Sequence, residues 1–346
     1  MPAIFNLMGR MHGPMDSTEE AILGWTRTAV LFVAMGMAAW MDHNDRRVPN
    51  EHWIEWSKPA IFIWALDLMV QGADWTVYLT ASAVVAYAST SVLGRATLRD
   101  ARDGSVVDRV VLVWYAASMF GVVAGALAFQ STTPMDVVLD DGDAMGILWW
   151  KTLGVGAVIA VVDLAWRFRL LHGGADAKAL MWVALLFPSW ATVPLSLSSV
   201  TDEALVVLPV ALALLMWGGL AFFAIPCLML VKNALNGHIR TLADLRLAWH
   251  ATRIPLDDVQ RRHVWLLTST MAMPDGSVHV VNTARAPRFT PSADEVALQV
   301  EGLANLGVEK VWVSMKIPLL VFLWPAMVPL VLFGEPTALL LSTVSP

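Results

Sequence analysis

The chain has 346 residues, of which 57% are hydrophobic and only 15% are charged. Soluble domains carry about 25% charged residues, and the apolar residues here fall into runs long enough to cross a bilayer, so the composition excludes an ordinary soluble protein. The net charge of −6 gives no reason to expect nucleic acid as a partner, and the single cysteine, Cys227, excludes an intrachain disulfide or a cysteine metal site.

Eight apolar stretches predict transmembrane helices in chain order. Residues 1–22, which precede the first stretch, lack the basic-then-apolar order of a secretory signal, so we expect that stretch to stay as a permanent helix. Pro209 and Pro226 are expected to kink the seventh helix, as membrane helices tolerate. The stretches are residues 23–41, 59–71, 75–93, 106–129, 145–166, 177–195, 205–231 and 317–333.

Basic and acidic residues alternate between successive loops, which predicts the orientation. Lys and Arg favour the cytoplasmic side, so this alternation places the N-terminus outside the cell. The expected cytoplasmic loops carry Arg46, Arg47, Lys58, Arg95, Arg99, Arg102, Arg109, Arg167, Arg169 and Lys178. The expected outer loops carry Asp74, Asp136, Asp140, Asp141, Asp143, Asp202 and Glu203.

The polar stretch before the last helix, residues 232–316, predicts a small α+β insert domain in the cytoplasm. Residues 264–271 and 278–282 flank the turn signal Pro274-Asp275-Gly276 and predict a β-hairpin. Residues 292–306 predict a helix and residues 311–313 a strand. The expected fold class is therefore an all-α polytopic membrane protein with this insert. We expect four parts: an extracellular segment 1–22, a transmembrane core 23–231, the insert 232–316, and a last helix with its tail, 317–346.

Two carboxylates are expected at the same membrane face. Asp42 ends the first helix and Asp176 opens the sixth, and the even number of helices between them returns the chain to one side. Two adjacent carboxylates share a proton, so one can take a proton from water while the other donates to a peptide carbonyl. Taken singly, each acid is also accounted for as a charged residue at a helix end. Asp45 is a rival to Asp42 three residues on.

Asp67 and Asp163 lie inside expected membrane helices, where an ionisable group is costly and needs a partner. Asp163 precedes Arg167 by one helical turn, which predicts an ion pair between them.

The acids lie in segments that resemble a known family. The segment Gly173-Gly174-Ala175-Asp176-Ala177-Lys178 resembles the Gly-x-Gly-Asp-x-Lys motif of type IV prepilin peptidases and archaeal preflagellin peptidases, with Ala175 in place of the second Gly. The segment from Asp42 to Val48-Pro49-Asn50 resembles the first motif of that family. Residues 311–318, which lead into the last helix, are similar to the C-terminal region of the archaeal branch.

The resemblance implies an aspartic-type endopeptidase of an archaeal cell membrane, with Asp42 and Asp176 as the catalytic pair of a transmembrane peptidase core. It implies that Gly173, Gly174, Ala175, Lys178, Pro49 and Asn50 shape the motif and the approach of the substrate. The implied partners are precursor proteins with a basic leader before a hydrophobic helix, together with membrane lipid. No metal or organic cofactor is expected.

Two other classes of function fit parts of the sequence. A proton-coupled transporter or channel would use Asp67, Asp163 and Asp176 as a relay, and would tolerate a change of Asp42 to Asn. A membrane scaffold would bind partners through the insert domain, and would tolerate replacement of both Asp42 and Asp176.

Overall fold

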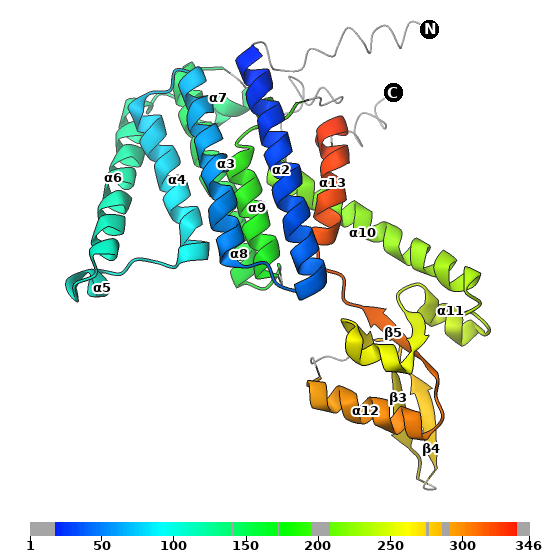
Figure 1. The fold of residues 1–346 in the computed structure, drawn as a ribbon. Helices are drawn as coiled ribbons and strands as arrows, with labels where there is room; N and C mark the ends of the chain where they lie inside the picture. The colour runs from blue at the N-terminus through cyan, green and yellow to red at the C-terminus, as the bar shows by residue number, and fades with distance from the viewer. Residues whose placement is uncertain are drawn as a thin grey trace, which may run out of the picture. The chain divides into compact units, whose positions relative to one another are not determined.

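The computed structural model describes residues 18–139, 141–171, 173–194, 208–274, 277–285 and 291–337. The chain forms two compact units: unit 1 is Met1–Gly219 with Pro318–Pro346, and unit 2 is Leu220–Ile317 (Figure 1). Within the described ranges, five helices are long and apolar enough to span a bilayer, which is the architecture of a helical membrane protein. They are α2 (Thr18–Asp45), α4 (Trp75–Leu93), α6 (Val106–Ala128), α8 (Ala144–Arg167) and α10 (Val210–Leu235).

The other three expected membrane helices exist but differ from the prediction, and the number of eight spans is not confirmed. They are α3 (Asn50–Val70), α9 (Gly174–Leu186) and the shorter apolar helix α13 (Leu320–Phe333). The helix α3 begins nine residues before the predicted start at residue 59, with Pro59 inside it. The helix α9 ends at Leu186, because the residue before Pro188 disfavours helical conformation.

The seventh predicted helix also needs a correction. Pro209 lies before the first residue of α10, so it begins the helix rather than kinks it, whereas Pro226 lies inside. The predicted stretches at 195 and 205–207 lie outside the described residues.

Unit 1 is a helical bundle built around α9 (Figure 1). The helix α9 packs against α3 and α8, α3 packs against α2, and α2 packs against α13, while α4 packs against α6 and α8 on the other side. All residues of α9 from Ala179 to Leu186 are buried, as expected for a helix that is apolar on every face. Three short helices, α5 (Leu98–Arg102), α7 (Pro134–Leu139) and the 3₁₀ turn η1 (Trp190–Thr192), lie between the long ones.

Unit 2 contains α10 from Leu220 onward and a small α+β region with two sheets. The first sheet has the order β1-β5-β2 with antiparallel pairing, and the second is the hairpin β3–β4. The strands are β1 (Thr252–Pro255), β2 (Val264–Leu266), β3 (Thr268–Ala272), β4 (Val278–Asn282) and β5 (Lys310–Met315). The helical segments are α11 (Leu242–Ala248), η2 (Leu256–Arg261) and α12 (Ala293–Asn305).

The hairpin predicted from residues 264–271 and 278–282 is only partly right. The first segment breaks at Leu267, which is buried and donates its backbone N–H to Trp312 O at 2.9 Å. The residues before Leu267 form β2, which pairs with β5, and those after it form β3, which pairs with β4. The expected turn residues Asp275 and Gly276 lie outside the described residues.

Candidate functional site

Asp42 continues the apolar face of α2 that packs on the bundle. Leu31, Met35 and Ala38 are buried at helical spacing on this face, and Asp42 is the next position in the series. Its exposed fraction is 8%, whereas Asp45, one turn on, is exposed. The helical period therefore turns Asp42 toward the other helices and the rival Asp45 toward solvent.

Asp176 lies in the first turn of α9, held by close packing around two glycines. Gly173 is the N-cap residue of α9, and a Cβ placed on it would collide with the carboxylate of Asp176. A Cβ on Gly174 would lie 3.2 Å from the Trp166 ring of α8, which is also tight. The two glycines thus allow the acid and the neighbouring helix to approach the turn, and the N-terminal position favours an ionised acid.

The two carboxylates interact across the α2–α9 contact. Asp176 lies outside the five helices that are long and apolar enough to span a bilayer, and its pKa is raised to about 7, first by burial and then by the negative charge of Asp42. The backbone N–H of Leu320, at the start of α13, lowers this pKa in part. At Asp42, burial disfavours the charged form, and the positive charge of Arg46 offsets this only in part. Near neutral pH the pair therefore holds a proton that an isolated acid would have lost.

A second contact joins the two motif segments at this end of the bundle. The ammonium of Lys178 donates a hydrogen bond to Asn50 Oδ1 at 2.7 Å, and Asn50 Nδ2 donates to the carbonyl of Val92 at 3.1 Å. Pro49 is the N-cap residue of α3, so it sets where Asn50 enters the helix. Asn50 consequently links the beginnings of α3 and α9 to the end of α4.

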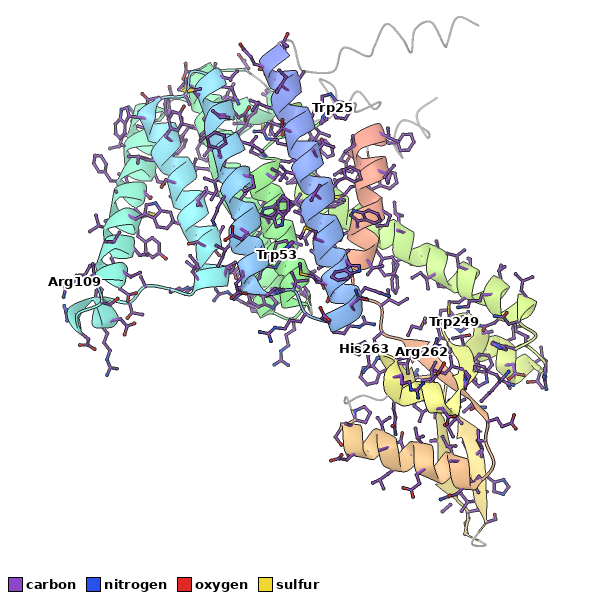
Figure 2. All side chains as sticks on the ribbon, in the orientation of Figure 1. Trp25, Trp53, Arg109, Trp249, Arg262 and His263 are labelled. Carbon is purple, nitrogen blue, oxygen red and sulfur yellow. The ribbon has the colours of Figure 1, made fainter. Side chains whose placement is uncertain are left out.

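Lys178 also borders an apolar groove of about 250 Å³ between α3, α4 and α9. Its walls include Trp53, Val85, Met181 and Trp182, and Trp53 is labelled in Figure 2. The Lys178 ammonium lies 5.8 Å from the ring centroid of Trp166, within the range of a cation–π contact. The groove can accept an apolar chain beside the motif lysine.

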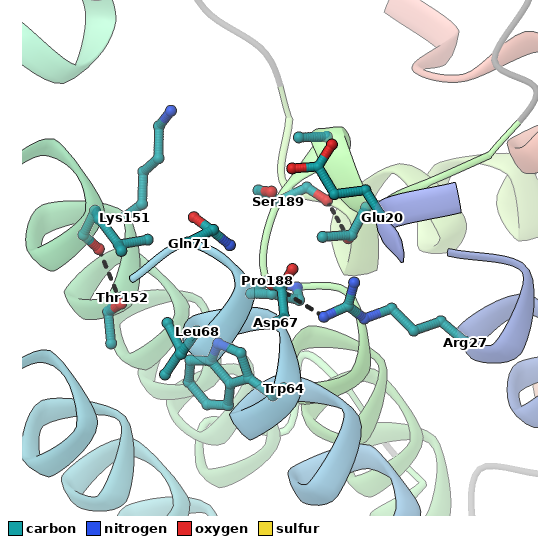
Figure 3. A pocket seen from close by; sticks show the side chains of 13 residues that line it. Glu20, Arg27, Trp64, Asp67, Leu68, Gln71, Lys151, Thr152, Pro188 and Ser189 are labelled. Carbon is teal, nitrogen blue, oxygen red and sulfur yellow. Dashed lines mark hydrogen bonds and ion pairs between the residues drawn. The ribbon is translucent and has the colours of Figure 1, made fainter. Parts of the chain in front are cut away.

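The two acids inside the bundle are engaged in ion pairs. Asp163 accepts from Arg167 Nε at 2.8 Å and from the Tyr87 hydroxyl at 2.9 Å, which confirms the pair predicted from spacing. Asp67 forms an ion pair with Arg27 at 3.0 Å, drawn as a dashed line in Figure 3. Arg27 was not predicted as the partner of Asp67, although an arginine inside an apolar stretch is itself a signal that a partner exists.

The Arg27–Asp67 pair borders a cavity of about 150 Å³ near the opposite end of α2 from Asp42 (Figure 3). Glu20 and Lys151 also line this cavity, so it carries charges of both signs. Both paired side chains are almost completely buried, at 1% and 7% exposed. The pair therefore neutralises two charges between α2 and α3, away from the Asp42–Asp176 site.

The carboxylates of Asp42 and Asp176 can together perform acid–base chemistry. One ionised and one protonated acid, placed together at a helix end, provide a proton acceptor and a proton donor for one water molecule. Among the described residues, no three His, Cys, Asp or Glu side chains come together in a group that could hold a metal ion.

Comparison of the chain with protein-family models gives no match, and comparison with curated proteins gives no significant match.

Proposed function

We propose that the protein is a membrane aspartic endopeptidase that removes basic leader peptides from precursors of the prepilin and preflagellin type. One observation carries the proposal: Asp42 and Asp176 interact at one end of the bundle, and the pKa of Asp176 is raised to about 7. The hydrogen bond between Asn50 and Lys178 supports it, because it joins the same two motif segments. The similarity to the peptidase motifs supplies the substrate class.

In the proposed reaction the two acids exchange roles around one water molecule. Ionised Asp42 takes a proton from the water as its oxygen attacks the peptide carbonyl carbon, and protonated Asp176 donates its proton to the carbonyl oxygen. The resulting tetrahedral diol collapses when Asp42 gives its proton to the departing amide nitrogen and Asp176 recovers a proton from a hydroxyl. The peptide bond is broken, and both acids return to their starting states.

The orientation that the loop charges favour would put this site at the cytoplasmic leaflet boundary. Arg46 and Arg47 directly follow the last residue of α2, and Lys178 lies near the start of α9. A substrate would then present its leader from the cytoplasm while its apolar helix stays in the bilayer. The groove beside Lys178 offers apolar surface at the same end.

The experiment is peptide cleavage by the full chain in phospholipid vesicles. The substrate is a synthetic peptide with a lysine-rich leader ending in Gly, followed by an apolar segment of about 20 residues. We expect Asp42→Asn and Asp176→Asn each to lower the cleavage rate on the order of 10³-fold, because each removes one acid–base group. The matched control is Asp45→Asn, which changes an exposed acid on the same helix and should leave the rate unchanged.

The alternative hypothesis, a proton-coupled transporter or channel, receives less support. Its relay needs Asp67 and Asp163 to be free to exchange protons, and each is engaged with an arginine. Loss of function on changing Asp67 or Asp163, with Asp42→Asn tolerated, would favour transport over proteolysis. Function that survives replacement of both Asp42 and Asp176 would favour the scaffold.

A further inference from the structure

The helix α11 in unit 2 presents an apolar face that the protein does not cover. Leu242, Leu245 and Trp249 follow one another at helical spacing and are 87%, 43% and 52% exposed. The opposite side of the helix, with Leu247 and Ala248, is buried in the core of unit 2. A helix on a water-facing surface would carry polar residues on its outer side, so this face is suited to a nonaqueous environment.

The charges around this face are basic. Arg246 is exposed among the three apolar residues, Arg240 is exposed just before the helix, and Lys232 is exposed in the last turn of α10. The acid of α11, Asp244, is turned inward, where it caps the helix with Thr241 and pairs with Arg253 at 2.6 Å. The outer surface of α11 therefore combines apolar side chains with positive charge, which is complementary to a lipid surface with anionic headgroups.

A buried asparagine fixes α11 to the end of α10. Asn233 in the last turns of α10 is 0% exposed and donates hydrogen bonds to the carbonyls of Ala248 and Ala251, both at 2.7 Å. Its Oδ1 accepts from the Thr252 hydroxyl at 2.9 Å. Because Asn233 is satisfied by groups on both sides of the α11 C-terminus, α11 holds a defined position relative to the axis of α10 within unit 2.

That position lies close to the C-terminal end of α10. The helix α10 is long and apolar enough to span a membrane, and Leu235 at its end is 83% exposed. The connection from Leu235 to Leu242 spans at most about 25 Å even if fully extended. Exposed apolar side chains therefore occur both at the end of α10 and on the outer side of α11, with a short stretch of chain between them.

We propose that the α11 face, defined as Leu242, Leu245, Arg246 and Trp249, lies in the headgroup region of the membrane and binds anionic phospholipid. The leucines enter the boundary of the acyl chains, and Trp249, labelled in Figure 2, takes the interfacial position that tryptophan favours. Arg246 contacts the lipid phosphates. This attachment does not depend on the proposed proteolysis; it ties unit 2 to the bilayer surface beside α10.

The test measures the depth of a spin label in the full chain. Cys227, the single cysteine, is replaced by Ser, and a nitroxide is attached at Leu245→Cys or, as the matched control, at Glu301→Cys on the exposed side of α12. Collision rates with oxygen and with a water-soluble nickel chelate are compared in vesicles of phosphatidylcholine with and without phosphatidylglycerol. We expect a severalfold higher oxygen-to-nickel ratio at position 245 than at 301, increasing with the anionic lipid, at a depth of about 5–10 Å.

A second pair of variants separates lipid binding from a local effect of the label. With the nitroxide at Ala243→Cys, also exposed on α11, the change Leu242→Glu should lower the ratio toward that at 301, and Arg246→Gln should remove its dependence on phosphatidylglycerol. A water-like ratio at 245 in both kinds of vesicle would overturn the proposal. So would low collision rates with both reagents, which would mean that protein, either the bundle or a second copy, covers the face.

Discussion

Asp176 differs from an ordinary surface acid because three features of its surroundings act on it together. Burial and the carboxylate of Asp42 raise its pKa, and the N–H of Leu320 opposes them in part. The result is a carboxyl group that titrates near neutral pH rather than near its usual value of 3.8. An acid–base group is most effective when its pKa lies near the working pH, so these surroundings suit the chemistry proposed for it.

The raised pKa has a consequence for stability. Because the folded chain retains the proton of Asp176 to a higher pH than the unfolded chain, stability falls as the pH rises from the usual pKa to about 7, and it stays lower above that. Asp176→Asn removes the penalty. We expect the variant to have an apparent Tm roughly 5 °C above the wild type at about pH 8 and little difference at about pH 4. Asp45→Asn, which changes an exposed acid, should show neither effect. An Asp176→Asn protein less stable than wild type at alkaline pH would contradict the burial of an ionised carboxylate.

The same titration predicts the alkaline limit of the proposed cleavage. Below about pH 7, Asp176 holds the proton that it would donate to the carbonyl oxygen; above it, Asp176 is ionised and the donor is lost. The rate should therefore fall as the pH rises through about 7, by about tenfold per pH unit once Asp176 has lost its proton. The measurement is the pH profile of kcat/KM for the synthetic leader peptide in vesicles. A rate that stays level to about pH 9 would show that Asp176 is not the proton donor.

Gly173 tests whether the placement of Asp176 matters. A methyl group at this position would collide with the Asp176 carboxylate, so Gly173→Ala should displace the acid while leaving α9 folded. We expect cleavage to fall about 10²-fold, mainly through kcat, since misplacement by about 1 Å is enough for such a loss. The control is Gly154→Ala on α8, where no atom lies within 4 Å of the added carbon. Equal activity in the two variants would argue against a fixed position for the carboxylate.

At the scale of elements, the buried Arg27–Asp67 pair joins α2 to α3. Removal of one partner leaves an uncompensated charge, so Arg27→Met should destabilise the protein by about 3–5 kcal/mol. The double variant Arg27→Met with Asp67→Leu removes both charges and should recover most of the stability. Thermal unfolding of the three proteins measures the coupling.

Activity of that double variant distinguishes the pair's role. Because the pair lies near the opposite end of α2 from Asp42, a folded double variant should cleave at the wild-type rate. Cleavage lost in a double variant of normal stability would mean that these helices carry a charge needed for function.

The helices that hydropathy defined best are those with an uninterrupted apolar stretch. The predicted stretch 75–93 has the same bounds as α4, and the stretches 106–129 and 145–166 agree with α6 and α8 to within one residue at each end. The start of α3 was missed because its first turns contain Glu51, Glu55 and Lys58, which interrupt the apolar stretch although they continue the helix. Hydropathy detects the apolar part of a helix, whereas the backbone hydrogen bonds that define the helix continue into the polar residues beyond that part.

At the scale of the whole molecule, the part of the candidate site that could be predicted is the part that follows from the even number of helices between Asp42 and Asp176. Counting helices brought Asp42 and Asp176 to one end, and the structure brings the two acids together. The contribution of Leu320 was not predictable, because a backbone N–H from the last helix leaves no signal in residue type. The α11 face was also missed, since a helix as short as α11, Leu242–Ala248, is too brief to show a period before its packing is known.

The most direct measurement of the central claim is cross-linking of the two acid positions in the native membrane. With Cys227 replaced by Ser, the full chain would carry Asp42→Cys and Asp176→Cys, and a control would carry Asp45→Cys and Asp176→Cys. A short membrane-permeant bis-methanethiosulfonate should join positions 42 and 176, slowing labelling by maleimide, and should join 45 and 176 much less. Failure to join 42 and 176, with the two cysteines reacting with impermeant maleimide from opposite sides of the membrane, would contradict the account.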